Sequence, residues 1–71
     1  SLCNTEAFQR FAAHREHTPA GTNAVDHAAD VIRKFCGIES RAELATDEKA
    51  QAMFARLMSI YRDYRESHGD R

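Results

Sequence analysis

The chain has 71 residues, of which 42% are hydrophobic and 30% charged, and its formal net charge is −1. This length corresponds to a single domain, residues 1–71, and the composition is too apolar for a disordered segment and too polar for a membrane span. Acidic and basic residues are interspersed, so the chain lacks the basic field that non-specific nucleic-acid binding requires.

The chain begins with Ser1-Leu2 rather than with Met. We expect a processed chain, a domain excised from a larger protein, or a cloning remnant at Ser1. In the second case part of the function belongs to residues outside this sequence.

The first predicted helix runs from Thr5 to His14 or Arg15. Asn4 is expected to be its N-cap, because a side-chain oxygen at that position accepts a hydrogen bond from the first turn. The apolar residues at helical spacing are Phe8, Phe11 and Ala12.

A loop, His17–Asn23, precedes the second predicted helix. Asn23 is the expected N-cap, and Gly37 occupies the C′ position, where a left-handed residue ends a helix. Ile38 follows and is expected to fold back on the last turn. The apolar stripe of this helix consists of Val25, Ala28, Ala29, Ile32 and Phe35.

Ser40 and Glu43 have the S-x-x-E spacing of a capping box, which predicts a helix of about one turn over residues 41–45. Thr46 is the expected cap of a long final helix, which ends between Arg65 and Ser67. Its apolar stripe, at steps of three and four, consists of Ala50, Met53, Phe54, Leu57, Ile60, Tyr61 and Tyr64.

No segment alternates apolar and polar residues as a strand does. We therefore predict an all-α fold, a small bundle of three main helices and one short connecting helix. The long final helix is expected to be the element on which the rest of the chain packs.

The side chains that carry chemistry show no catalytic or metal-binding spacing. A zinc site needs close pairs of ligands, and only His14 and His17 are close in sequence, whereas Cys3 and Cys36 are far from both; His27 is a further isolated candidate. We expect two reduced, structural thiols in a cytoplasmic protein. The chain is predicted to be neither an enzyme nor a holder of a metal or cofactor, and a bundle this small is expected to have little room for a ligand pocket.

A small nucleic-acid-binding accessory domain is the alternative function. The second helix, Gly37 and the Ser40 helix resemble a helix-turn-helix in outline, and Arg33, Lys34 and Arg41 are positioned to meet phosphates. Acidic residues crowd the same region, and the second of these helices is short for a recognition helix.

The apolar stripe of the final helix is wider than the surface that one small core can cover. We expect an exposed strip at Phe54, Met58 and Tyr61, rimmed by Arg62 and Arg65, and assign these five residues to partner binding. Two interpretations stay open: a surface for a protein partner or a second copy, and the scattered apolar exposure that is normal for soluble proteins.

One stretch resembles a known family. Ser40-Arg41-Ala42-Glu43-Leu44, Thr46, Ala50, Met53 and Leu57 are similar to the C-terminal domain of phage single-strand annealing recombinases of the Redβ type. The likeness covers about 20 residues, and Ala45 is an extra residue before the Thr. It implies a helical docking module of a phage or prophage protein, since in that family the domain docks the partner exonuclease and single-strand binding protein.

Overall fold

Three α-helices and two short 3-10 turns form the part of the chain that the computed structural model describes, residues 1–69. In chain order they are η1 (Leu2–Asn4), α1 (Glu6–Arg15), α2 (Ala24–Cys36), η2 (Arg41–Ala45) and α3 (Glu48–Ser67). No strand occurs within residues 1–69, so the predicted all-α bundle with a short connecting helix is confirmed.

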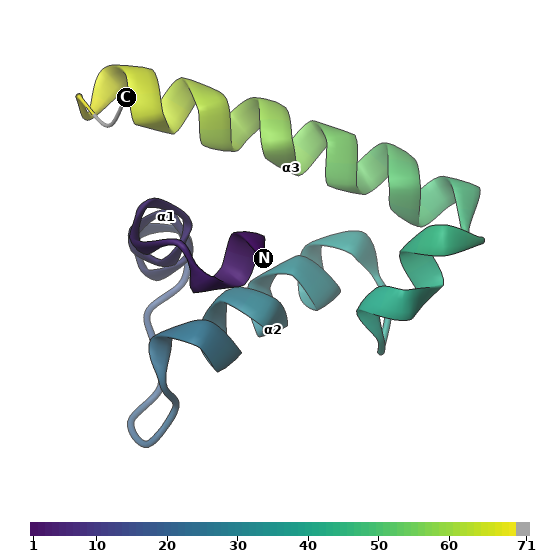
Figure 1. The fold of residues 1–71 in the computed structure, drawn as a ribbon, viewed down its shortest axis with the longest axis horizontal. Coiled ribbons are helices and arrows are strands. Elements are labelled where there is room, and N and C mark those ends of the chain that lie inside the picture. Colours follow the sequence, from purple (N-terminus) through teal and green to yellow (C-terminus); the bar gives the residue numbers. More distant parts are fainter. Residues whose placement is uncertain (70–71) are drawn as a thin grey trace.

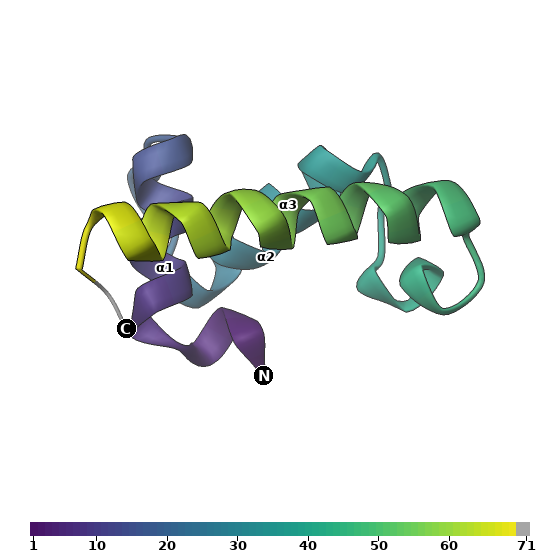
Figure 2. The ribbon, with the colours of Figure 1, turned by 90° about the horizontal axis from the view of Figure 1, so that it is seen from above.

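The helices cross rather than lie parallel. Figure 1 shows α3 extended over α2, with α1 seen end-on beneath the C-terminal half of α3 and η2 at the opposite end. The domain measures 33 × 29 × 19 Å, and the 10-residue α1, about 15 Å long, accounts for most of its thinnest dimension. Figure 2 confirms that α1 and η2 lie at opposite ends of α3. Among the helices of residues 1–69, none combines the length and apolar character that spanning a bilayer requires.

The central element is α2, not α3 as the sequence suggested. It contacts each of the other four elements, and six of its 13 residues are buried, against three of the 20 residues in α3. Because neighbours cover more than one side of α2, its buried face is wider than the predicted stripe. It includes His27 and Val31 in addition to the predicted stripe, which Cys36 ends. The prediction for Val25 is wrong, because this residue of the stripe is 37% exposed.

Aromatic side chains join α1 to α3 in the core. The ring of Tyr61 lies 5.1 Å from that of Phe8, edge to face, and 5.1 Å from that of Phe11. Such ring pairs stabilise a core beyond the area they bury. They fix the C-terminal half of α3 on α1.

The capping signals place most helix ends correctly. Asn23 accepts a hydrogen bond from the Asp26 N–H, and Gly37 ends α2 in the left-handed conformation with φ 70°. The Ser40–Glu43 capping box is present at η2. Ile38 is buried after the Gly37 stop, as expected.

Two predicted caps are wrong by one residue. Thr5, rather than Asn4, accepts from the Phe8 N–H at the start of α1, because residues 2–4 wind into a turn of their own. Asp47, rather than Thr46, accepts from the Ala50 N–H at the start of α3, because Thr46 still closes η2.

Candidate functional site

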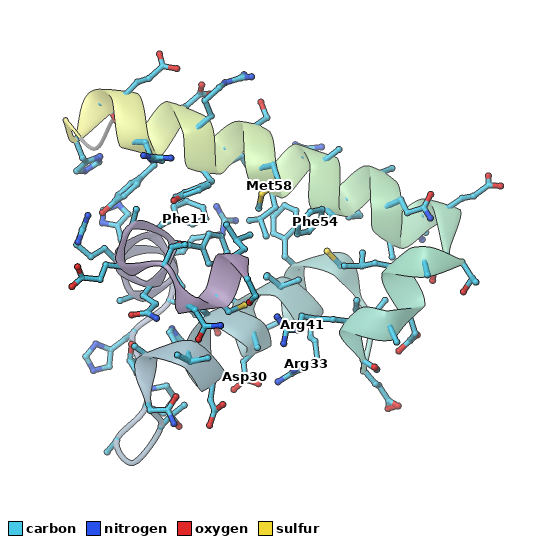
Figure 3. The ribbon with its side chains drawn as sticks, in the orientation of Figure 1. Phe11, Asp30, Arg33, Arg41, Phe54 and Met58 are labelled. Atoms are coloured by element: carbon cyan, nitrogen blue, oxygen red, sulfur yellow. The ribbon has the colours of Figure 1, made fainter. Side chains whose placement is uncertain are left out.

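The predicted partner surface lies along one edge of α3. Phe54 and Met58 are four residues apart, so they share that edge, and Arg62 continues it four residues later. Both apolar side chains are half-buried and pack against the core cluster. Figure 3 shows them pointing from α3 toward α2. The predicted exposed strip is therefore not found as such: Phe54 and Met58 are half-buried, and among the described residues Val25 is the large hydrophobic side chain that is exposed.

Tyr61 is not part of this surface. The prediction that it lies in an exposed strip is wrong, because its side chain is 8% exposed and is held between the rings of Phe8 and Phe11. Its ring instead supports Arg65, whose guanidinium carbon lies 5.6 Å from the ring centroid. A guanidinium at this distance is attracted to the face of the ring, which orients the half-buried Arg65 side chain.

Arg62 is the exposed cation of the edge. Its Nη2 donates to Ser59 Oγ at 3.3 Å, and its Nε lies 3.9 Å from a carboxylate oxygen of Asp63. Both members of the ion pair are about 70% exposed, and such pairs contribute little to stability. The Arg62 charge is therefore available to a partner.

Further apolar side chains of α3 are half-buried. These residues are Met53, Ile60 and Tyr64. The sequence placed them in the apolar stripe but did not assign them to the partner surface. Met53 and Ile60 lie seven residues apart on the flank opposite Met58, judged from helical spacing. We therefore describe the candidate surface as the Phe54–Met58 edge, formed by Phe54, Met58, Arg62 and Arg65.

The cations of the alternative, nucleic-acid interpretation already have partners. Arg33 pairs with Asp30 on the same helix, and Lys34 pairs with Glu16 at the end of α1. Arg41 reaches across from η2 and donates to Cys3 Sγ at 3.2 Å (Figure 3). The two ion pairs are exposed and contribute little to stability, so the charges of Arg33 and Lys34 remain available to a ligand, as that of Arg62 does.

The two cysteines are structural in their surroundings. Both are free and buried. Burial raises the pKa of the Cys36 thiol, which disfavours the thiolate that a nucleophile or a metal ligand requires. Cys36 therefore packs as a small hydrophobic residue, as predicted.

The histidines have three different environments. His14 and His17 are exposed, as expected at a helix C-terminus. His27 is 4% exposed, and its Nε2–H donates to the Glu16 carbonyl at 2.7 Å, since a carbonyl oxygen can only accept. His68, for which the sequence predicted no role, lies beside His14. No local signal reveals this pair, because the two residues are far apart in sequence.

A surface cleft of about 410 Å³ lies between the end of α1 and α2. This cleft is closer to an open groove than to an enclosed pocket. The cleft is lined by Arg15, Glu16, Val31, Lys34 and Phe35. Its charged groups pair with each other or with the cleft wall: Lys34 with Glu16, and Arg15 with the Phe35 ring at 5.0 Å.

Comparison of the chain with models of known protein families, with curated proteins and with solved structures gives no significant match.

Proposed function

We propose that this chain is a non-catalytic helical docking domain that binds another protein through the Phe54–Met58 edge of α3. The observation that carries the proposal is the pair of half-buried apolar side chains, Phe54 and Met58, with Arg62 and Arg65 beside them on the same helix. Methionine and aromatic residues are enriched at protein interfaces, and so is arginine.

The partner that fits this edge is an amphipathic helix with an apolar face and acidic flanks. An apolar helix face would cover the remaining surface of Phe54 and Met58, as in helix-in-groove recognition. Acidic flanks would complement Arg62 and Arg65, which favours a faster and more selective encounter than a neutral rim would give.

Two further features support a cytoplasmic location and a phage or prophage origin for the proposed docking domain. The unpaired state of Cys3 and Cys36 fits a protein of the reducing cytoplasm. The resemblance of residues 40–57 to the docking domain of phage annealing recombinases favours a phage or prophage protein.

The test uses two synthetic helical peptides with the same leucine face, one flanked by glutamates and one by lysines. Binding is measured by isothermal titration calorimetry at low and high salt. We expect the glutamate peptide to bind the chain at least about tenfold more tightly than the lysine peptide, corresponding to about 1.4 kcal/mol. Equal binding of the two peptides, or binding of neither, would contradict the proposal.

The matched variants are Arg62→Glu and Arg56→Glu. Both residues are exposed, but Arg56 lies two residues before Met58 and therefore on another side of α3. Arg62→Glu should reverse the peptide preference, and Arg56→Glu should leave it unchanged.

Two parallel measurements test whether a second copy of the chain or a nucleic acid binds instead of a foreign helix. A dimer in sedimentation that Met58→Gln dissociates would assign the edge to a second copy of the chain. Binding of a single-stranded oligonucleotide with a steep salt dependence would favour the nucleic-acid alternative instead.

A further inference from the structure

A cluster of three rings lies where the C-terminal ends of α1 and α3 meet. His68 stacks on Tyr64 with ring centroids 4.1 Å apart, and His14 lies 5.2 Å from Tyr64 and 5.4 Å from His68. Both histidines are exposed. The cluster adjoins the core through Tyr64, whose ring lies 5.3 Å from that of Phe11, and it is separate from the Phe54–Met58 edge.

We propose that His14 and His68 form a two-imidazole site for a divalent transition-metal ion of the Zn²⁺ type. The inference is independent of the docking function. A bound ion would link the last turn of α1 to the C-cap of α3, at the end of the domain where those helices meet.

The separation of the two rings fits such a site. With Zn–N bonds of about 2.0–2.1 Å, each ring centroid lies about 3.2 Å from the ion, and a tetrahedral angle then places two centroids about 5 Å apart. The observed separation of the His14 and His68 centroids is 5.4 Å. The rings are steeply tilted to one another, at 64°, and both side chains are exposed, so a shared ion requires the His14 ring to turn one nitrogen toward His68.

The hydrogen bonds of His68 involve Nδ1 and leave the other ring nitrogen, Nε2, available to bind a metal ion. Its Nδ1 lies 2.9 Å from the Tyr64 carbonyl oxygen and 3.2 Å from Ser67 Oγ. Because the carbonyl oxygen can only accept, the tautomer with the proton on Nδ1 satisfies the shorter contact. The lone pair is therefore on Nε2. Metal-binding histidines commonly donate their second ring N–H to a backbone carbonyl in this way, which fixes the tautomer and orients the ring.

The ligand count determines which ions the site would take. Within residues 1–69 no third Cys, His, Asp or Glu joins the pair, so water would complete the coordination. Imidazole ligands favour Zn²⁺, Cu²⁺ and Ni²⁺ over Mg²⁺ and Ca²⁺, which prefer oxygen. We therefore expect reversible binding that adds to a fold already formed.

The experiment follows thermal unfolding of the untagged chain by circular dichroism in metal-free buffer, with added Zn²⁺ or Mg²⁺. An ion that binds the folded state raises the melting temperature in a concentration-dependent way. We expect a saturable increase with Zn²⁺ that EDTA reverses, and none with Mg²⁺. No increase with Zn²⁺ would overturn the proposal.

Variants assign the effect to the pair. His14→Ala and His68→Ala should each weaken Zn²⁺ binding, measured by calorimetry, at least about tenfold, whereas His17→Ala is the matched control and should bind normally. All three residues are exposed, so the variants are expected to fold, and their helical signal verifies this. Equal losses in His17→Ala and His14→Ala would overturn the assignment.

Fluorescence gives a second readout at the site itself. The chain has no Trp and two Tyr, of which Tyr64 contacts both histidines. Binding of Cu²⁺, a fluorescence quencher, should reduce the tyrosine emission of the native chain and should do so much less in His68→Ala. Equal quenching in both proteins would place the ion elsewhere and overturn the proposal.

Discussion

At the scale of single residues, side-chain to backbone hydrogen bonds determine where helices begin. Ser40 and Asn23 are N-caps as predicted, and Gly37 ends α2 as predicted through its left-handed backbone. Asn4 and Thr46 are not N-caps, although each is adjacent to a residue that is. Thr46 and Asp47 are both good caps by residue type, and the path of the chain out of η2 selects Asp47.

This difference between neighbours can be measured. Asp47→Ala should lower the free energy of unfolding by about 1 kcal/mol, because the Ala50 N–H loses its acceptor. Thr46→Ala removes no helix cap and should change stability by less than half as much. Urea unfolding of both variants checks this, and a larger loss in Thr46→Ala would support the cap predicted from sequence.

His27 acts at the same scale but across two helices. Its buried ring joins α2 to the end of α1 through the Glu16 carbonyl. His27→Ala should destabilise the fold by about 2 kcal/mol, since it removes packing and leaves a part-buried carbonyl without its donor. The control His17→Ala should be nearly neutral in the same thermal unfolding experiment. Similar stability of the two variants would show that the His27 contact is dispensable.

At the scale of the element, α3 has a narrow buried line and wide half-buried flanks. Ala50, Leu57 and Tyr61 are buried along the line, while Phe54 and Met58 keep part of their surface exposed. The reason is geometric: α1 and α2 pack against one side of α3 and cover less than half of its circumference. The surplus apolar width visible in the sequence therefore becomes a half-buried flank, which is the surface of the proposed docking function.

Leu57 and Met58 are adjacent in α3, but replacing each by Ala should lower the free energy of unfolding by very different amounts. Leu57→Ala leaves a cavity in the core and should cost about 3 kcal/mol, because Leu57 is fully buried. Met58→Ala should cost about 1 kcal/mol, since part of the removed surface was already in contact with water. Chemical denaturation distinguishes the two, and equal losses would mean that Met58 belongs to the core rather than to the Phe54–Met58 edge.

At the scale of the whole molecule, α2 holds the domain together by contacting all other elements. The chain's first residues complete the core: Cys3 in η1 is 1% exposed, accepts a hydrogen bond from Arg41, and its carbonyl accepts one from Gln9. Distant parts of the sequence therefore meet around α2, and the cooperativity of folding is expected to include η1.

The two thiols report on this global packing. In the native protein Cys3 and Cys36 should react with a thiol reagent at least about tenfold more slowly than in denaturant, because both are buried and the pKa of Cys36 is raised. Two thiols per chain should react after denaturation, and added reductant should leave the melting temperature unchanged. Fast labelling of Cys3 in native conditions would show that η1 opens independently of the core.

The sequence by itself determined the helical class, the ends of α2, the capping box and part of each apolar stripe, because these depend on residues within a few positions of one another. It also indicated that Phe54 and Met58 exceed what a small core can bury. The tertiary structure decided the rest. Tyr61 became buried because Phe8 and Phe11 close around it, α2 became central because four elements converge on it, and His14 met His68 because α1 and α3 end side by side. Each of these depends on contacts between distant segments, which periodicity along one helix does not encode.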